Sequence, residues 1–248
     1  MQDDALLDVL AGAVAVVQGA LATIEDWRPA GEIVGQYALD LVADGPVCDH
    51  LVAAGLGVLS EESGRHHPER EITVVVDPVD GSTNASRRIP YYATSLCAVD
   101  ADGPRAAMVV NLATGERFDA VRGGGARRDG RPIRASATTE LADALIAVNG
   151  LPDAHWGWAQ YRAFGAAALD LCAVACGRVD AYVDATQSSH GPWDYLGGLL
   201  ICTEAGAVVT DADDRDLVVL EHTARRTPIA AATPELHAAI RGSRARRP

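Results

Sequence analysis

Residues 74–84 read Val-Val-Val-Asp-Pro-Val-Asp-Gly-Ser-Thr-Asn, and the rest of the chain is organised around this stretch. Three β-branched residues in a row predict a buried strand, which ends in two carboxylates, a glycine and two hydroxyls. Asp77 and Asp80 lie three residues apart around a turn, so both can converge on one hard cation, and Gly81 allows a ligand to approach the backbone closely. The same residue types also form ordinary turns, so the motif alone leaves a purely structural turn open.

Composition excludes several classes of protein. The chain has 248 residues, of which 48% are hydrophobic, enough for a large core in one domain or in two closely packed halves. Its formal net charge of −13 disfavours nonspecific binding to nucleic acid, which requires a basic footprint. All 21 basic residues are arginine, so no lysine can act as a base, a Schiff-base former or a phosphate ligand.

The cysteines and the N-terminal segment favour a cytoplasmic protein. The five cysteines are odd in number and lack the spacing of paired metal ligands, which predicts buried, reduced thiols. The apolar segment at the N-terminus begins with two aspartates and has no basic region, so we expect neither a signal peptide nor a membrane span. Apolar residues at helical spacing from Leu6 to Ile24 instead predict a long amphipathic helix, which the segment Trp27–Gly31 ends.

Turn residues and periodicity predict the remaining elements. A second helix is expected to begin at Asp44, which would cap it, with Pro46 in its first turn and its end near Ala54. A short strand follows at Val58-Leu59. Antiparallel strands are then expected at 93–99, 106–111 and 117–121, with another hairpin at 123–130. Later strands are expected at 145–148, 181–183, 207–210, 217–219 and 229–231, and helices at 165–176, 193–204 and 234–240.

This order of elements predicts an α+β protein in two parts. Residues 1–135 would form an N-terminal half that contains the antiparallel sheet and the main metal-binding motif. Residues 136–248 would form a C-terminal α/β half that completes the active site.

Three segments taken together resemble the inositol monophosphatase family of Mg²⁺-dependent, lithium-sensitive phosphomonoesterases, which are relatives of fructose bisphosphatase. The segments are Glu61-Glu62, residues 77–84, and the helix that opens with Trp193-Asp194 and ends near Glu204-Ala205-Gly206. The resemblance covers the chain from Glu61 to the C-terminus. It implies a layered α/β/α/β/α sandwich and a homodimer that hydrolyses a small polyol, sugar or related metabolite phosphate by attack of a metal-activated water.

The resemblance also implies a role for each matching residue. Two or three Mg²⁺ ions, for which Mn²⁺ could substitute, would be held by Glu61, Asp77, the Val79 carbonyl, Asp80 and Asp194. Glu61 would also contact the attacking water, and the hydroxyl of Ser82 would orient it. The substrate would contact Asp80, the backbone N–H groups of Gly81, Ser82 and Thr83, and further along the chain Ala167 and Asp184.

The chain departs from the family pattern in two places. Upstream of Glu61 the family carries a lysine, then an aspartate, a threonine and a second aspartate, which partners the water-orienting hydroxyl. Here residues 40–44 are a shortened remnant in which Ala43 replaces the threonine, and Asp44 is the expected partner of Ser82. The segment between Asp184 and Asp194 is longer than usual, which leaves the substrate open; His190 within it is expected to face solvent, with a substrate contact as the alternative.

Two other functions compete with a metal-dependent phosphatase. A haloacid dehalogenase-type phosphatase would use Asp77 as a covalent nucleophile, but two residues separate Asp77 from Asp80 where that motif has one, and the required lysine is absent. The chain could instead be a degenerate family member that binds a metal or ligand, or serves as a scaffold, without turnover. The missing lysine and the shortened segment favour this reading, whereas the complete set of metal-ligand positions opposes it.

Overall fold

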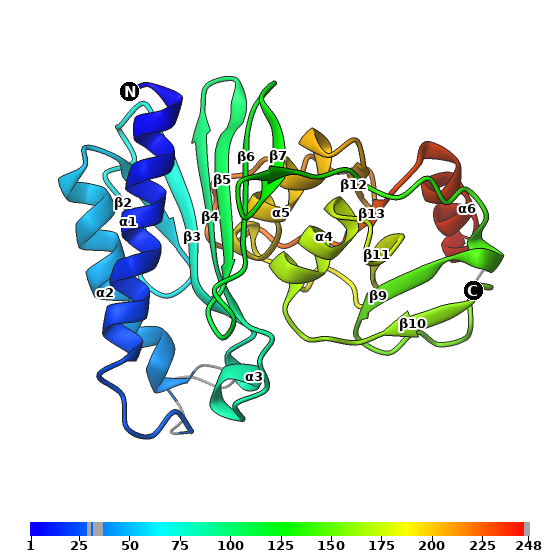
Figure 1. Ribbon diagram of the computed structural model, residues 1–248, viewed down its shortest axis with the longest axis horizontal. Helices are drawn as coiled ribbons and strands as arrows, with labels where there is room; N and C mark the ends of the chain where they lie inside the picture. Colours follow the sequence, from blue (N-terminus) through cyan, green and yellow to red (C-terminus); the bar gives the residue numbers. More distant parts are fainter. Residues whose placement is uncertain (29–30, 32–36, 246–248) are drawn as a thin grey trace.

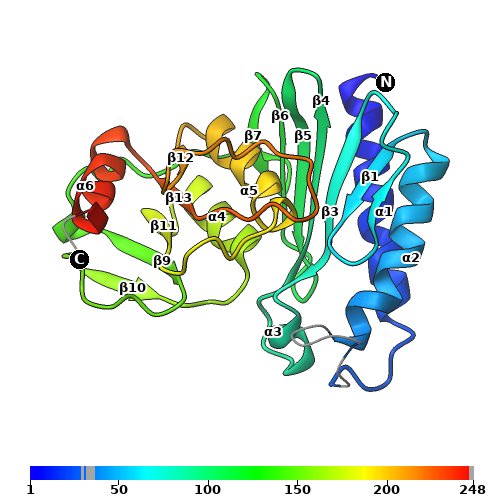
Figure 2. The same ribbon diagram turned by 180° about the vertical axis from the view of Figure 1, so that it is seen from behind.

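A computed structural model describes residues 1–28, 31 and 37–245 of the chain, so Pro29 and Ala30, part of the expected end of the first helix, lie outside the described residues. Five layers follow one another along the long axis of the molecule (Figure 1). They are two helices, an eight-stranded sheet, two more helices, a five-stranded sheet and a final helix. The view from behind shows the same order of layers (Figure 2). The predicted α+β sandwich is therefore confirmed.

The first sheet has the strand order β2-β1-β3-β4-β5-β6-β7-β8. Its strands are β1 (Gly57–Ser60), β2 (Gly64–His66), β3 (Thr73–Asp80), β4 (Ala93–Asp100), β5 (Gly103–Asn111), β6 (Arg117–Val121), β7 (Gly125–Arg128) and β8 (Arg131–Pro132). Strands β1 and β3 are parallel, and all other neighbours in this sheet are antiparallel. The predicted meander from β4 to β8 is thus confirmed.

Helices α1 (Asp3–Leu21) and α2 (Ala38–Ala53) cover one face of this sheet (Figure 2). By length and composition α1 could cross a membrane. In this fold, however, Leu6, Leu10 and Val17 on its apolar side are fully buried in the core that it shares with α2 and the sheet. Burial of one face is what an amphipathic core helix requires.

Helix α2 begins at Ala38, six residues before the predicted start at Asp44. Asp40 is the third residue of the helix, and its Oδ2 accepts a hydrogen bond of 2.9 Å from the backbone N–H of Tyr37. This bond satisfies one of the free N–H donors at the helix start. Asp40 therefore caps the helix, the role that the sequence predicts for Asp44. Pro46 consequently lies inside the helix rather than in its first turn.

The second sheet has the strand order β10-β9-β11-β13-β12. Its strands are β9 (Leu145–Asn149), β10 (Gln160–Arg162), β11 (Ala181–Asp184), β12 (Val208–Asp211) and β13 (Pro228–Ala231). Helices α4 (Ala167–Ala175) and α5 (Pro192–Glu204) lie between the two sheets, and α6 (Pro234–Ala245) lies on the outer face of the second sheet (Figure 1). Among the described residues there are also two short helices, α3 (Ser82–Ser86) and the 3₁₀ helix η1 (Leu141–Asp143).

The second half differs from the expected elements in two places. Strand β10 is not predicted from the sequence, because its three exposed residues show no apolar alternation. The predicted strand at 217–219 is not a strand: Leu217 is buried and its carbonyl accepts a hydrogen bond of 2.9 Å from the hydroxyl of Tyr195, without pairing in a sheet. The apolar residues there pack against the core, and the N–H of Val219 bonds to the carbonyl of Leu217 at 3.1 Å within the segment itself.

The five cysteines are free, and four of them are buried, whereas Cys176 is half-buried. Burial raises the pKa of the Cys97 thiol, which keeps it in the uncharged form at neutral pH. The buried thiols agree with the prediction from cysteine number and spacing.

Helix α5 fits between the first sheet and α4 because it carries Gly197 and Gly198 in its middle. A Cβ at Gly197 would lie 2.8 Å from Oγ of Ser95 on β4, and a Cβ at Gly198 would lie 2.5 Å from Cβ of Leu171 on α4. Both distances are shorter than van der Waals contact. The two glycines therefore set how closely α5 approaches its neighbours on both sides.

We expect Gly198→Ala to destabilise the protein by about 1–3 kcal/mol, because the added methyl group overpacks the contact between α4 and α5. Gly19→Ala is the matched control, since Gly19 is an exposed residue of α1 with no atom within 4 Å of an added Cβ. That change should leave stability unchanged or raise it by up to about 1 kcal/mol. Thermal unfolding of both variants tests the contact, and equal melting temperatures would contradict it.

Candidate active site

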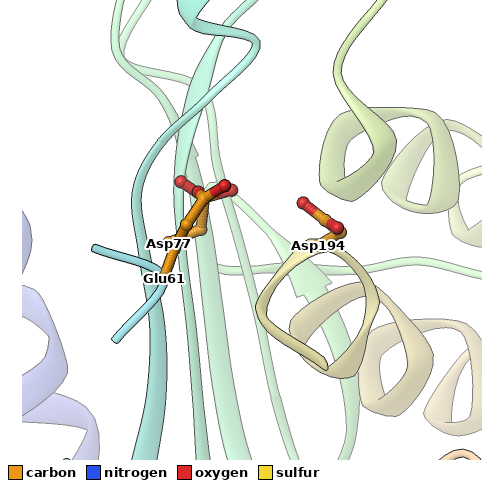
Figure 3. Close-up of side chains that lie close together, drawn as sticks. All are labelled: Glu61, Asp77 and Asp194. Carbon is orange, nitrogen blue, oxygen red and sulfur yellow. The ribbon is translucent and has the colours of Figure 1, made fainter. Parts of the chain in front are cut away.

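Three acidic side chains from distant parts of the sequence converge at one point between the first sheet and α5 (Figure 3). Glu61 follows β1, Asp77 lies near the end of β3, and Asp194 is the third residue of α5. One carboxylate oxygen from each of the three lies within 4.8 Å of the other two. Figure 3 shows the carboxylate of Asp194 facing those of Glu61 and Asp77.

Strand pairing brings Glu61 to Asp77. Strands β1 and β3 run parallel with Ser60 beside Val76, and the N–H of Glu61 donates a hydrogen bond of 3.1 Å to the Val76 carbonyl. The residues that follow this pair, Glu61 and Asp77, are therefore two acids side by side at the same edge of the sheet. All eight residues of β3 are buried, so the Asp77 carboxylate is the buried member on the sheet side of the cluster.

The start of α5 fixes Asp194. The backbone N–H of Gly191 donates a hydrogen bond of 2.7 Å to Oδ2 of Asp194. The carbonyl of the preceding residue, Trp193, accepts a hydrogen bond of 3.1 Å from the Ser95 hydroxyl on β4. The helix start is thereby tied to the first sheet, which holds the third carboxylate of the cluster in place.

The cluster concentrates negative charge, and its one basic neighbour among the ion pairs of the described residues is His190, whose Nδ1 lies 3.5 Å from Oδ2 of Asp194. Burial raises the pKa of Asp77 well above its usual range, and the charges of Glu61, Asp80 and Asp194 add to the effect. Burial, followed by the charge of Asp194, also raises the pKa of Glu61. Within the described part of the chain, no arginine forms an ion pair with any of the three clustered acids. A divalent cation would neutralise this charge, and a set of carboxylate oxygens fits Mg²⁺.

Asp80 lies beside the cluster as the cap of α4. Its two carboxylate oxygens accept hydrogen bonds of 3.2 and 2.7 Å from the N–H groups of Ala167 and Ala168. Burial raises the pKa of Asp80 to about 7, and the charge of Asp194 adds to the shift. The structure thus connects two predicted site residues, Asp80 and Ala167, through a hydrogen bond, while the predicted metal role of Asp80 and substrate role of Ala167 stay predictions.

The partner of Ser82 is Asp40 and not Asp44, which corrects the sequence-based prediction. The Ser82 hydroxyl lies 2.8 Å from Oδ1 of Asp40 and 2.9 Å from the carbonyl of Val79, a predicted metal ligand. Because α2 begins six residues earlier than expected, Asp40 stands at the end of the helix that faces Ser82. Burial raises the pKa of Asp40 to about 7.

Asp44 lies one helical turn further along and is buried in the core of the first half. Its Oδ1 accepts hydrogen bonds from the hydroxyl of Ser60 and, at 3.5 Å, from the thiol of Cys48. Asp40 and Asp44 are four residues apart and share one face of α2. Sequence spacing therefore cannot distinguish which of them reaches the site.

The turn after Asp80 requires glycine. Gly81 has φ = 85°, and an added Cβ would lie 3.1 Å from the carbonyl oxygen of Gly165 and 3.2 Å from that of Tyr91. The amide of Asn84 then donates hydrogen bonds of 2.8 and 2.7 Å to the carbonyls of Tyr91 and Phe164. The end of the motif is thus tied to the segment before α4. Thr83, the other predicted phosphate contact here, has its hydroxyl 3.3 Å from that of Tyr37.

Asp184 and His190 are both buried, on the second-sheet side of the cluster. The Asp184 carboxylate, predicted to contact substrate, accepts hydrogen bonds of 3.0 Å from Asn149 and 3.0 Å from Ser189, and others from Thr186. The expectation that His190 faces solvent is wrong, because the residue is 8% exposed. Burial opposes its protonation, but the neighbouring carboxylates of Asp194, Asp184 and Asp80 together outweigh burial and raise the pKa of His190.

No local sequence feature indicates that His222 belongs to this region. Its Nε2 lies 2.7 Å from the carbonyl oxygen of Glu61, and its ring packs 5.0 Å from that of Trp193. The guanidinium of Arg225 lies over the ring of Trp193, 5.0 Å from the ring centre. This segment is more than 25 residues beyond Trp193 in sequence, so only the fold brings it to the site.

The chain shares sequence similarity with known proteins. The inositol monophosphatase family matches residues 38–247. A fructose-1,6-bisphosphatase/inositol-1-monophosphatase from Archaeoglobus fulgidus is 35% identical over 206 residues, which cover 81% of this chain and 80% of that protein. The Nus factor SuhB of Salmonella typhimurium LT2 is 32% identical over 169 residues, and the match covers 62% of each chain.

The fold is shared by solved structures. A protein from Pyrococcus horikoshii with similarities to inositol-1 monophosphatase superposes with a TM-score of 0.87 at 26% identity, covering 98% of this chain and 99% of that chain. An inositol monophosphatase from Anabaena superposes with a TM-score of 0.78 at 28% identity, covering 99% of this chain and 97% of that one.

The raised pKa values predict how Mg²⁺ affects stability. An acid whose pKa is higher in the folded state favours folding below its unfolded pKa of about 4, and this contribution is lost as pH rises toward its folded pKa. The metal-free protein should therefore lose this stabilisation between about pH 4 and pH 7, the pKa of Asp80. Mg²⁺ should compensate for it increasingly as the pH rises, because protons then compete less for the carboxylates.

At pH 7.5, saturating Mg²⁺ at 100 times its dissociation constant should raise the melting temperature by roughly 5–10 °C, from about 2.7 kcal/mol of linkage. The increase should be smaller at pH 5. Thermal scans with EDTA or Mg²⁺ measure the effect, and Asp77→Asn serves as the control that removes one ligand. An increase that does not depend on pH or on Asp77 would show that Mg²⁺ acts elsewhere.

Proposed function

This chain belongs to the inositol monophosphatase family, and on that premise we propose that it is a Mg²⁺-dependent phosphomonoesterase acting on a small polyol, sugar or related metabolite phosphate. The observation that carries the proposal is the convergence of Glu61, Asp77 and Asp194, whose one basic neighbour among the ion pairs of the described residues is His190 beside Asp194. A relative named for fructose-1,6-bisphosphatase and inositol-1-monophosphatase supports the substrate class.

The acidic cluster would hold the cation. Glu61, Asp77 and Asp194 would supply its carboxylate oxygens. The Val79 carbonyl and Asp80 would be further ligands, as the family resemblance implies. When bound, Mg²⁺ would supply a Lewis acid that lowers the pKa of a water and neutralises phosphate charge. Mn²⁺ is a chemically reasonable substitute, because it also prefers oxygen ligands. We propose that the site holds two or three ions.

Ser82 and Asp40 would orient the attacking water. The Ser82 hydroxyl can donate to Oδ1 of Asp40 at 2.8 Å while its oxygen accepts a hydrogen bond from water. Asp40 is itself held by the N–H of Tyr37, so the hydroxyl has a fixed direction. Positioning of this kind reduces the entropy lost on reaching the transition state.

Asp40 and Asp44 make a matched pair for testing this role. Asp40→Asn should lower kcat about 100-fold, because the Ser82 hydroxyl loses its charged acceptor next to the water. Asp44→Asn, an identical change one helical turn away, should alter kcat less than threefold, since Asp44 bonds to Ser60 in the core. Steady-state kinetics of both variants measure the effect. The assignment fails if Asp44→Asn is the more damaging change.

The activity itself is tested by release of inorganic phosphate from a substrate panel with Mg²⁺ or Mn²⁺. The panel includes inositol monophosphates, fructose bisphosphate, histidinol phosphate and nucleoside 3′-phosphates. We expect turnover of at least one substrate, abolished by EDTA and reduced at least 100-fold in Asp77→Asn. An absence of turnover across the panel, with the wild-type protein folded and metal-bound, would refute the proposal.

A catalytically silent family member is the second candidate. Two observations favour it: the chain has no lysine, and a relative of similar identity is named as a Nus factor. Such a protein would bind Mg²⁺ and phosphate without hydrolysis, which calorimetry combined with the substrate panel distinguishes. The haloacid dehalogenase alternative is dropped, because that chemistry belongs to a different fold from the sandwich of this chain. Homodimerisation, a cytoplasmic location and the absence of nucleic-acid and membrane partners stay predictions.

A further inference from the structure

His190 is held rigidly beside the acidic cluster. It lies between β11 and α5, directly before Gly191, and only 8% of it is exposed. Its N–H donates to the carbonyl of Arg226 at 3.2 Å, and its own carbonyl accepts the N–H of Arg226 at 2.8 Å. This two-way bridge fixes the backbone of His190 against a segment that lies 36 residues later.

The imidazole ring connects a buried tyrosine to Asp194. The hydroxyl of Tyr182, on β11, lies 2.6 Å from Nε2 of His190, and Tyr182 is fully buried. The other ring nitrogen, Nδ1, lies 3.5 Å from Oδ2 of Asp194. A bare Nδ1 lone pair facing a carboxylate would be repelled, so Nδ1 carries a hydrogen, and Nε2 interacts with the Tyr182 hydroxyl.

The contacts of Asp194 fall on one of its two oxygens. Oδ2 receives the N–H of Gly191 at 2.7 Å and faces Nδ1 of His190 at 3.5 Å. The side chain as a whole points toward Glu61 and Asp77 (Figure 3). With Oδ2 held by the protein, Oδ1 is the oxygen left to bind a cation.

We propose that His190 is a positioning residue that holds Asp194 ready to ligate the cation, with Tyr182 fixing the ring. The inference rests on the metal site of the proposed function, but it concerns metal affinity and not turnover. Outer contacts of this kind orient a carboxylate ligand before the metal binds, and their loss typically costs 10- to 100-fold in metal affinity. Asp184 also lies near the ring, with its Oδ2 3.9 Å from Nε2 of His190.

Three substitutions of His190 distinguish the contributions of its two ring nitrogens to Mg²⁺ affinity. His190→Ala should weaken Mg²⁺ binding at least 10-fold, measured by isothermal titration calorimetry on the full chain without substrate. The amide nitrogen of His190→Asn lies close to the place of Nδ1, so this variant should recover most of the lost affinity. His190→Gln extends its amide toward the place of Nε2 and should recover little.

Two controls exclude a general effect on folding. His237, on α6, is also 8% exposed, and its Nε2 lies 2.9 Å from the Thr210 hydroxyl. His237→Ala should lower the melting temperature and leave Mg²⁺ affinity within twofold of wild type. Tyr182→Phe should weaken Mg²⁺ binding less than His190→Ala, and the double variant should bind no more weakly than His190→Ala alone, because Tyr182 acts through the ring.

The outcomes are distinct. Wild-type affinity in His190→Ala, or equal losses in the Asn and Gln variants, overturns the positioning role. If His190→Ala fails to fold, the Asn, Gln and Tyr182→Phe variants still decide the question. A wild-type protein that binds Mg²⁺ but hydrolyses nothing refutes the proposed function alone, whereas one that binds no Mg²⁺ refutes both.

Discussion

Buried and half-buried carboxylates that form no ion pair with an arginine among the described residues are the constraint around which this structure is built. Negative charge in a poorly solvated site is costly, and the fold offsets part of that cost by placing acids at helix starts. Asp40 is the third residue of α2, Asp194 is the third residue of α5, and Asp80 caps α4. Each receives at least one backbone N–H. Helix dipoles contribute about 0.3–1 kcal/mol per acid, which leaves charge in the cluster for a cation to neutralise.

Sequence patterns predicted the elements whose own residues carry the signal. The meander, the helices between the sheets and the end of β3 follow from alternation, helical spacing and turn residues. The start of α2 did not, because its N-cap is Tyr37, outside the usual Ser, Thr, Asp and Asn, and two aspartates on one helix face offered the same pattern. The segment at 217–219 is apolar like a strand, but pairing with a neighbour is a property of the fold and not of the segment.

The residues of the candidate site also fall into those that the sequence predicts and those that it does not. Glu61, Asp77 and Asp194 were predicted, because strand ends and the family motif mark them. His190 and His222 were not, because their burial depends on contacts with residues far away in sequence. His190 is covered only when the chain near Arg226 pairs with it, and His222 meets the carbonyl of Glu61 across 161 residues. A loop histidine has no local feature that distinguishes these positions from solvent exposure.

Helix α5 connects packing to chemistry, because carboxylates that receive backbone N–H groups anchor it at both ends. Asp194 takes the N–H of Gly191 at the start, and Glu204 takes the N–H groups of Gly123 and Gly125 at 2.8 and 2.9 Å at the end. Glu204 opposes the helix dipole at that position, and the two hydrogen bonds from the glycine run offset this. With its middle set by close contacts at two glycines, α5 can move little along its axis. The position of Asp194 relative to Asp77 is therefore fixed by packing that extends the whole length of the helix.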